Sequence, residues 1–459
     1  MNDRLAVAGG TGLIGRMVVD GARAAGREPV VLAAADRIRA AGDRNLRTVA
    51  DSNRRAAASD PAGRRSGRGV MRVGIIGGGI GGLATAVGLQ RAGADVAVFE
   101  RHDRPAVSGS GISLFGNGMA ALTALGLAEP AREIGAVPGG LGIGTLAGQR
   151  RPDGRWLARL PRVATATVAV VHRADLHRIL RDALAPGTLR TGRAVHRVSP
   201  DGRTIEMSGS SETFDVVVAA DGIHSRIRGD WPGDSGVRYA GYVAWRGVTD
   251  RPVDVSSGSG ETVGRGLRFG IAPLADGRVY WFAVVSQPID APAPDGPAVA
   301  AQRFGGWHAP IRELIESTAP DGIHGLPIEE LAGRLPTFCR GRCVLLGDAA
   351  HGMTPNLGQG GNQALEDATT LAALLGAPGG IDEALAEYDR LRRPRTQRIA
   401  RRASILGRVL QAGGPVASRL RDVAMRLSPP SVTARGVRSV QRWEPPAQPA
   451  RPPVNGGAR

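Results

Sequence analysis

A glycine-rich turn between an apolar strand and a helix constrains the fold of this chain most. Residues 72–76 form a short apolar run, and the segment that follows, Gly77-Gly78-Gly79-Ile80-Gly81-Gly82, fits the pattern G-x-G-x-x-G. Residues 83–92 then show the apolar spacing of a helix, and residues 95–99 have the character of a second strand that ends at Glu100. This order predicts a βαβ unit whose helix N-terminus receives a dinucleotide.

The glycines of this turn have distinct expected roles. Gly77 should allow the tight turn, Gly79 should let the backbone approach a pyrophosphate, and Gly82 should let helix and strand pack closely. Unpaired N–H groups at the helix N-terminus attract phosphate. Glu100 follows Gly77 by 23 residues, where a carboxylate can accept hydrogen bonds from ribose hydroxyls. The motif alone does not choose between NAD and FAD, and a purely structural turn is the alternative.

Two further apolar strands run into glycine–acid pairs. Residues 214–220 lead to Asp221-Gly222, and residues 343–346 lead into "GDAAHGMTPNLGQGGNQALEDA", residues 347–368, where Asp348 precedes a glycine-rich loop and a helix. Doubly wound sheets bind ligands at the carboxyl ends of their strands, so the three sites predict one long ligand that touches the sheet several times. For Asp348 taken alone, a helix cap is the alternative.

Together the three motifs resemble those of the single-component FAD-dependent aromatic hydroxylases, the para-hydroxybenzoate hydroxylase-like flavoprotein monooxygenases. The resemblance covers about residues 71–425 and rests on "GGGIGG…E", "DGIHSRIR" and "GDAAHGMTPNLGQGGNQALEDA". It implies an α/β fold with a Rossmann-like FAD-binding domain, a mixed antiparallel-sheet substrate domain and C-terminal helices.

The same resemblance implies FAD as the cofactor and distributes its contacts along the chain. The first motif would hold the ADP half, Val195 would meet the adenine, and Asp348 would bind the ribityl chain. The loop at 358–361 would face the pyrimidine side of the flavin, where backbone N–H groups at a helix N-terminus stabilise the charge of the reduced ring. The implied cofactor-binding residues are Gly77, Gly79, Gly81, Gly82, Glu100, Arg101, Ser113, Arg173, Val195, Asp221, Asp348, Leu357, Gly358, Gln359, Gly360 and Gly361. For Arg173, a solvated charge at a helix start is the alternative.

Residues 238–300 alternate in polarity and carry most of the aromatic side chains, which predicts antiparallel strands. In the resembled fold such a sheet covers the flavin and shapes the substrate pocket. About half of the side chains on a strand must face away from any pocket. The candidates to line it are Tyr239, Tyr242, Trp245, Arg246, Phe269, Tyr280 and Trp281. Similarity to urate-hydroxylase-like members further implies substrate contacts, and hence a catalytic role, for Arg228 and Tyr239.

The implied activity is hydroxylation of an electron-rich aromatic or heteroaromatic small molecule with NAD(P)H and O2, through a C4a-hydroperoxyflavin. Epoxidation, Baeyer–Villiger-type oxygenation and a non-catalytic flavin-binding protein are the alternatives. A halogenase-like relative would need a lysine in its pocket, and all 59 basic residues of this chain are arginine. Tyr239, His224 and His351 are candidates to relay a proton, although a loop histidine bonded to backbone is the simpler interpretation of His351. NADH and NADPH fit the motifs equally well, as do a monomer and a homodimer.

The motifs divide the chain into a central unit and two flanks. Residues 1–33 resemble the truncated start of an atypical short-chain dehydrogenase, and one βαβ start cannot form a dinucleotide site by itself. We therefore expect the working protein to begin at Met71. The expected divisions are a remnant at 1–33, a disordered linker at 34–70, a monooxygenase unit at 71–426 with FAD-binding parts 71–180 and 340–426 and a substrate sheet at about 230–330, and a disordered tail at 427–459.

Composition excludes several other classes. The net charge is +17, but the first 70 residues alone hold 13 arginines against seven acidic residues, and aromatic residues make up only 4%. Nucleic-acid binding is therefore disfavoured, because it needs clustered arginines interleaved with aromatic residues. The two cysteines, Cys339 and Cys343, imply neither a disulfide framework nor a metal site, which favours a cytoplasmic location. The sequence contains no run of 18 apolar residues, so it does not predict a transmembrane helix.

Overall fold

The computed structural model describes residues 6–8, 30–32, 70–104, 110–135, 147–160, 168–290 and 296–447. The chain divides into two units, 1–69 and 70–459. In the first unit, β1 (Ala6–Ala8) and β2 (Val30–Leu32) pair in parallel. The linker expected at 34–70 lies outside the described residues except for Val70.

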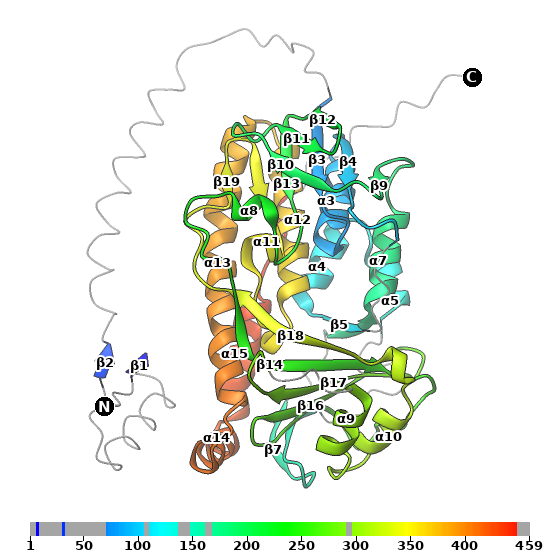
Figure 1. Ribbon diagram of the computed structural model, residues 1–459, viewed down its shortest axis with the longest axis vertical. Helices are drawn as coiled ribbons and strands as arrows, with labels where there is room; N and C mark the ends of the chain where they lie inside the picture. The colour runs from blue at the N-terminus through cyan, green and yellow to red at the C-terminus, as the bar shows by residue number, and fades with distance from the viewer. Residues whose placement is uncertain are drawn as a thin grey trace. The chain divides into compact units, whose positions relative to one another are not determined.

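A six-stranded sheet organises one end of the second unit (Figure 1). All neighbouring strands pair in parallel except the first two, which are antiparallel. The order is β19 (Cys339–Arg340), β20 (Cys343–Leu345), β13 (Val216–Ala219), β3 (Arg72–Ile76), β4 (Asp95–Phe99) and β9 (Leu189–Arg190). The central strands are continuous apolar runs because both faces of a parallel sheet are covered.

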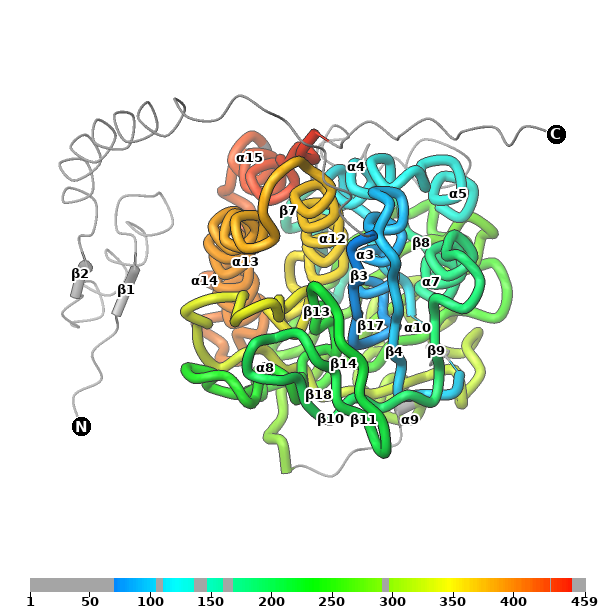
Figure 2. The backbone as a smooth tube through the Cα atoms, turned by 90° about the horizontal axis from the view of Figure 1, so that it is seen from above, coloured from blue at the N-terminus to red at the C-terminus, as the bar shows by residue number. Residues whose placement is uncertain are grey.

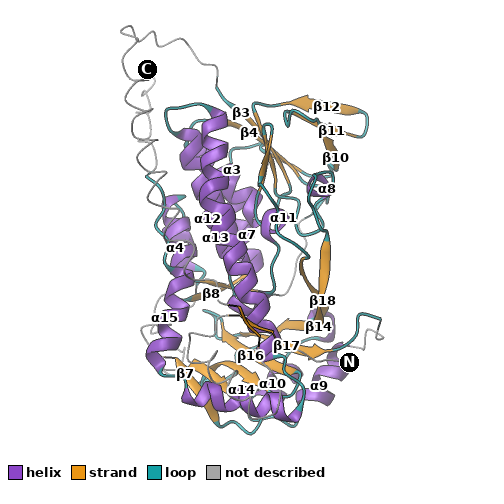
Figure 3. Ribbon diagram, turned by 90° about the vertical axis from the view of Figure 1, so that its left-hand side faces the viewer, coloured by secondary structure: helices purple, strands orange, loops and turns teal. Residues whose placement is uncertain are grey.

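Helices cover one face of this sheet and a small antiparallel sheet covers the other (Figure 3). On the helical face, α3 (Ile80–Arg91), α12 (Gly360–Gly376) and α13 (Ile381–Leu410) lie side by side (Figure 2). The opposite face carries the meander β10 (Val195–Val198), β11 (Thr204–Met207) and β12 (Ser210–Thr213).

A seven-stranded sheet forms the other end of the unit (Figure 1). Its strands pair antiparallel except for the parallel pair β15–β6. The order is β18 (His324–Leu331), β14 (Val237–Val248), β17 (Val279–Ser286), β16 (Leu267–Pro273), β15 (Ser259–Val263), β6 (Ala147–Arg150) and β7 (Trp156–Leu160). Phe269 and Trp281 on its outer face pack with Phe304 and Leu314 from α9 (Gly296–Phe304) and α10 (Ile311–Glu316).

The chain passes between the two sheets more often than the expected divisions allow. The hairpin β6–β7 lies within the predicted FAD-binding range 71–180 but belongs to the seven-stranded sheet. Conversely, β9 and β13 lie between the two predicted FAD-binding ranges but belong to the six-stranded sheet. The predicted domain bounds are therefore wrong at these strands, because each sheet is assembled from segments far apart in the sequence.

The C-terminal helices also differ from the predictions. Residues 382–410 lie in one long helix, α13, which contains Pro394. Arg392 and Arg395, on either side of the proline, both bind the buried carboxylate of Glu366, so the helix is anchored on both sides of this residue. The disordered tail predicted for 427–459 is wrong over α15 (Pro430–Gln441), whose Val440 is buried against Ile399.

The remaining elements are short or connect these layers. They are β5 (Gly111–Leu114), α4 (Gly116–Ala124), α5 (Ala128–Glu133), β8 (Ala169–His172), α7 (Arg173–Asp182), α8 (Arg226–Gly229), η1 (Pro320–Gly322), α11 (Asp348–His351), η2 (Pro355–Leu357) and α14 (Pro415–Leu427). Strands β5 and β8 pair antiparallel, which places Ser113 opposite Val170.

Candidate active site

A cavity of about 400 Å³ lies between the six-stranded sheet and the seven-stranded sheet. All three predicted patches border it, through Gly79, Gly222 and Asp348. They meet because β3, β13 and β20 are adjacent and parallel, so their carboxyl ends share one edge of the sheet. The predicted convergence of the three motifs is therefore present.

The glycine turn after β3 has the geometry expected from the sequence. Gly77 has φ +104°, and a Cβ there would collide with the carbonyl oxygen of Ala220. A Cβ on Gly82 would collide with the carbonyl oxygen of Gly77, so the close packing of helix and strand needs glycine. At Gly79, by contrast, a Cβ would meet no protein atom within 4 Å. The bare backbone of Gly79 therefore borders space that a ligand can fill.

Glu100 is tied to this turn by hydrogen bonds. Its Oε2 accepts from the backbone N–H of Gly78 over 2.8 Å, and its Oε1 accepts from the N–H of His102 over 2.9 Å. Gly81, on the first turn of α3, borders the cavity, whereas Glu100 does not. Arg101 is exposed beside it and its Nε contacts the His102 ring at 3.1 Å.

Asp221 is half-buried at the turn that follows β13. Its Oδ2 accepts from the N–H of Arg226 over 3.0 Å, but within the described part of the chain its buried Oδ1 has no hydrogen-bond partner. Burial raises the pKa of this carboxyl, and hydrogen bonds from Ser225 and nearby backbone partly oppose that effect. The neighbouring Gly222 has φ +87°, and a Cβ there would again meet no protein atom within 4 Å. The turn thus presents bare backbone and an unused acceptor.

The loop between β20 and α12 contributes the third side of the cavity. Asp348 is exposed towards it, and its carboxylate has no hydrogen bond or ion pair within the described ranges. Gly358 is left-handed, with φ +62°, and a Cβ there would lie 2.8 Å from the Phe115 ring. Gly360 and Gly361 begin α12 at the cavity wall, where the first N–H groups of a helix have no intrahelical acceptor. These backbone donors suit an anionic or electron-rich ligand edge.

The other predicted cofactor residues divide between the cavity and its surroundings. Ser113 on β5 and Arg173 at the start of α7 line the cavity. Val195, which begins β10, lies outside the lining. Leu357 packs near Met353 and Ile399, and Gln359 is buried in a polar network, so neither side chain lines the cavity.

One face of the seven-stranded sheet forms the opposite wall. The alternation of β14 and β17 brings Ala244, Arg246, Tyr280, Phe282 and Val284 to the cavity. Trp245, Phe269 and Trp281 face the other way and form a core with α9 and α10. Tyr242 is buried, and its hydroxyl accepts from Asn356 Nδ2 over 2.9 Å. Of the seven residues that the sequence analysis named as candidates to line the substrate pocket, Arg246 and Tyr280 line the cavity.

Both predicted catalytic residues lie outside the cavity lining. Arg228 is buried, pairs with Asp234 at 3.2 Å and donates to the carbonyl oxygens of Ile223 and Ala349 at 2.7 and 3.1 Å. The hydroxyl of Tyr239 donates to the carbonyl oxygen of Gln287 over 2.9 Å. Their side chains are thus engaged in holding loops rather than facing the cavity. The lining residues that the sequence did not indicate include Glu261, Arg268, Met353, Phe282 and Asn356.

Comparison with known proteins identifies the group to which this site belongs. The family described as FAD binding domain matches residues 70–403. This chain belongs to the FAD binding domain family. Aurachin C monooxygenase/isomerase of Stigmatella aurantiaca is 37% identical, over 80% of this chain and 97% of that protein. The 3-amino-4-hydroxybenzoate 2-monooxygenase of Streptomyces cremeus is also 37% identical, over 72% and 86%.

The solved structures agree with this membership. Klebsiella pneumoniae HpxO complexed with FAD and uric acid is 28% identical, with a TM-score of 0.72 over 81% of this chain and 96% of that one. The salicylate hydroxylase substrate complex shares the fold, with a TM-score of 0.63. This member of the FAD binding domain family is a flavin-dependent monooxygenase, and its cofactor is FAD.

The cavity fits that cofactor on its own geometry. Two glycines whose Cβ atoms would point into empty space and the open carboxylate of Asp348 border one continuous volume. Asp221, whose buried Oδ1 has no partner among the described residues, is next in sequence to Gly222 at this volume. An extended ligand with a pyrophosphate and a polyhydroxyl chain uses all of these features.

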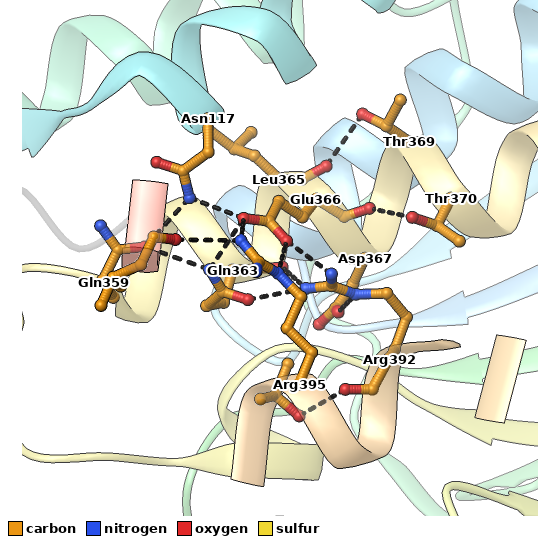
Figure 4. A network of polar contacts seen from close by, with 12 residues as sticks. Asn117, Gln359, Gln363, Leu365, Glu366, Asp367, Thr369, Thr370, Arg392 and Arg395 are labelled. Atoms are coloured by element: carbon orange, nitrogen blue, oxygen red, sulfur yellow. Dashed lines mark hydrogen bonds and ion pairs between the residues drawn. The ribbon is translucent and has the colours of Figure 1, made fainter. Parts of the chain in front are cut away.

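A buried polar network fixes the end of α12 that borders the cavity (Figure 4). Arg392 donates to Asp367 over 2.6 Å and to Glu366 over 2.5 Å, and all three side chains are almost completely buried. Asn117 Nδ2 donates to Glu366 and to Gln359, over 2.6 and 3.0 Å. The network therefore joins α4 and α13 to the residue that precedes α12.

The proposed proton-relay histidines lie away from the cavity wall. His351 is buried, and its Nε2 shares a hydrogen bond of 2.6 Å with Asp367 Oδ2. His224 is exposed and pairs with Glu329 at 2.9 Å. Neither ring lines the cavity. The simpler interpretation from the sequence was that His351 bonds to backbone. In the structure, its Nε2 bonds to a carboxylate instead.

The two cysteines form no disulfide bond with each other. Both cysteines are free, and burial raises the pKa of Cys339 to about 12 and that of Cys343 further. They are packing residues. Among the described residues, no group of three or more histidine, cysteine, aspartate or glutamate side chains is arranged to hold a metal ion. No helix in the described ranges is both long and apolar enough to cross a membrane.

Proposed function

We propose that this flavoprotein hydroxylates an electron-rich aromatic or heteroaromatic small molecule, using NAD(P)H and O2. The observation that carries the proposal is the cavity itself, which joins the convergent glycine–acid patches to an aromatic sheet face. Relatives named as acting on aminohydroxybenzoate and urate support the same chemistry.

The described residues suggest how each part of FAD is held. Gly79, Gly81 and the N-terminus of α3 would receive the pyrophosphate, and Asp348 would accept hydrogen bonds from the ribityl hydroxyls. The N–H groups at Gly360 and Gly361 would lie against the pyrimidine edge of the ring. When bound there, FAD supplies the electron transfer from NAD(P)H and the activation of O2.

The chain's own contribution is placement, charge stabilisation and exclusion of water. Backbone donors at the start of α12 are fixed before reaction by the buried network, so they stabilise negative charge without reorganisation. The apolar side chains Phe282, Val284 and Met353 also line the cavity and would exclude water from the surface that they occupy. A covered cavity protects reactive species from solvent.

The test is reconstitution followed by turnover. The purified protein should show flavin absorption bands, and a panel of phenols and heteroaromatic compounds should contain members that accelerate NAD(P)H oxidation and gain one oxygen atom by mass spectrometry. A colourless protein that cannot take up FAD would refute the proposal. Flavin binding without accelerated oxidation by any compound would instead indicate a non-catalytic flavin-binding protein.

A further inference from the structure

One cation at the sheet side of the cavity has no partner among the residues that the structure describes. Arg246 is half-buried on β14, on the face that lines the cavity. Across the ranges that the structure describes, its guanidinium forms no hydrogen bond and no ion pair. A guanidinium that has lost part of its water usually has an anionic partner, because removing a charge from water without one is unfavourable.

Of the two other arginines that line the cavity, Arg173 is a predicted cofactor contact and Arg268 already has an acidic partner. Arg268, on β16, pairs with Glu261 at 3.0 Å, and its Nε donates to Gln411 over 2.8 Å. The same guanidinium lies 5.5 Å from the centre of the Tyr242 ring. The charge of Arg268 is therefore already paired with a carboxylate, whereas that of Arg246 has no acidic partner within the described ranges.

The surface around Arg246 is suited to an aromatic ring. Phe282 is directly opposite it in the β14–β17 register, and Tyr280 and Val284 lie on the same face. Burial raises the pKa of the Tyr280 phenol, an effect that the nearby Arg246 and Arg173 partly offset. The phenol is thus a neutral hydroxyl near pH 7, and it can donate to an oxygen atom beside the arginine.

We propose that Arg246 selects aromatic substrates that carry a carboxylate. The carboxylate pairs with the guanidinium while the ring lies against Phe282 and Val284. Arginine suits this task because its planar fork binds a carboxylate through two parallel hydrogen bonds. The inference rests on the proposed function and narrows its substrate class to aromatic acids.

The experiment measures ligand binding to the FAD-loaded full-length protein. Benzoate, 4-hydroxybenzoate, 1-naphthoate and quinoline-2-carboxylate are each titrated beside the corresponding carboxamide, and changes in flavin absorption give the dissociation constants. We expect at least one acid to bind about tenfold or more tightly than its amide. Arg246→Gln should abolish that preference, and Arg246→Lys should restore part of it. Arg278→Gln is the matched control, because Arg278 pairs with Asp276 in the turn before β17, outside the cavity lining.

The outcomes separate this inference from the proposed function. FAD-loaded protein that binds acids and amides equally, binds no acid at all, or keeps its acid preference in Arg246→Gln would overturn the inference alone. Loss of FAD from Arg246→Gln would show that this side chain contacts the cofactor, and this result would also overturn the inference. Wild-type protein that binds no flavin would refute the proposed function, and the inference with it.

Discussion

Nε of Arg392 donates to Oδ1 of Asp367 over 2.6 Å, and both side chains are almost completely buried. The same carboxylate accepts from the backbone N–H of Gly347, which precedes Asp348 at the cavity. The pair therefore connects α13 to the residue next to a candidate cofactor contact. Fully hydrogen-bonded buried networks of this kind hold one arrangement rigidly, and their rupture leaves buried charges without partners.

Replacing Arg392 should be severely destabilising. Arg392→Met leaves Glu366 and Asp367 buried with fewer partners, and loss of one member of a buried pair costs about 3–5 kcal/mol. Urea unfolding followed by circular dichroism should show this as a lower midpoint. The control is Arg390→Met, two residues away on α13, whose ion pair with Glu387 is exposed to solvent and therefore contributes little to stability. Equal midpoints for the two variants would contradict the role assigned to the network.

The network should also make stability depend on pH in the acid range. Burial opposes ionisation of Asp367, but His351 and Arg392 outweigh it and lower its pKa from 3.8 to about 2. A carboxyl whose pKa is lower in the folded state stabilises the fold above its unfolded pKa, and this contribution disappears as pH falls towards the folded value. The loss should therefore occur between about pH 4 and pH 2, and it amounts to about 2 kcal/mol.

Thermal unfolding across that range provides the measurement. The difference in Tm between wild type and Asp367→Asn should narrow as pH falls from 4 to 2. Asp382→Asn should show no comparable trend, because Asp382 is exposed on α13 beside Arg342. A constant difference between wild type and Asp367→Asn would argue against an ionised Asp367.

The sequence predicted the cofactor side of the fold well because its signals are local. A strand, a glycine turn and a helix follow one another within residues 72–92, and Gly77 and Gly82 each have a steric reason that the structure shows. Parallel strands then bring their ends together, so the meeting of Gly79, Gly222 and Asp348 follows from topology alone.

The polar network was not predictable in the same way. The arginines of α13 are spaced like a solvated face, and only contact with Glu366 and Asp367, more than 20 residues earlier, turns Arg392 inwards. The alternation of side chains along a strand is limited in the same way. It predicts that every second side chain of β14 faces the cavity, but it does not say which set of alternate residues does so. The resemblance implied Arg228 and Tyr239, yet the pairing of β14 with β17 brings Ala244 and Arg246 to the cavity.

A chain that begins at Met71 should retain full FAD content and NAD(P)H oxidation. Every residue that lines the cavity follows Met71, and the chain divides at residue 69. Flavin absorbance per mole of protein and the turnover rate, each compared with the full-length chain, provide the measurement. Loss of either property would show that residues 1–70 contribute to the working protein.

Two glycines of the first motif should separate cofactor binding from folding. A Cβ on Gly79 meets no protein atom within 4 Å, so Gly79→Ala should unfold at nearly the wild-type temperature without FAD. It should nevertheless weaken FAD binding by about tenfold or more, because the added methyl occupies the approach to the pyrophosphate. Gly82→Ala should instead lower the Tm of the FAD-free protein sharply, because its Cβ collides with the carbonyl oxygen of Gly77. Fluorescence titration with FAD and thermal unfolding of the FAD-free proteins measure the two effects independently. If Gly79→Ala bound FAD as tightly as wild type, the pyrophosphate could not lie against this turn, and the placement of FAD along the three patches would have to be abandoned.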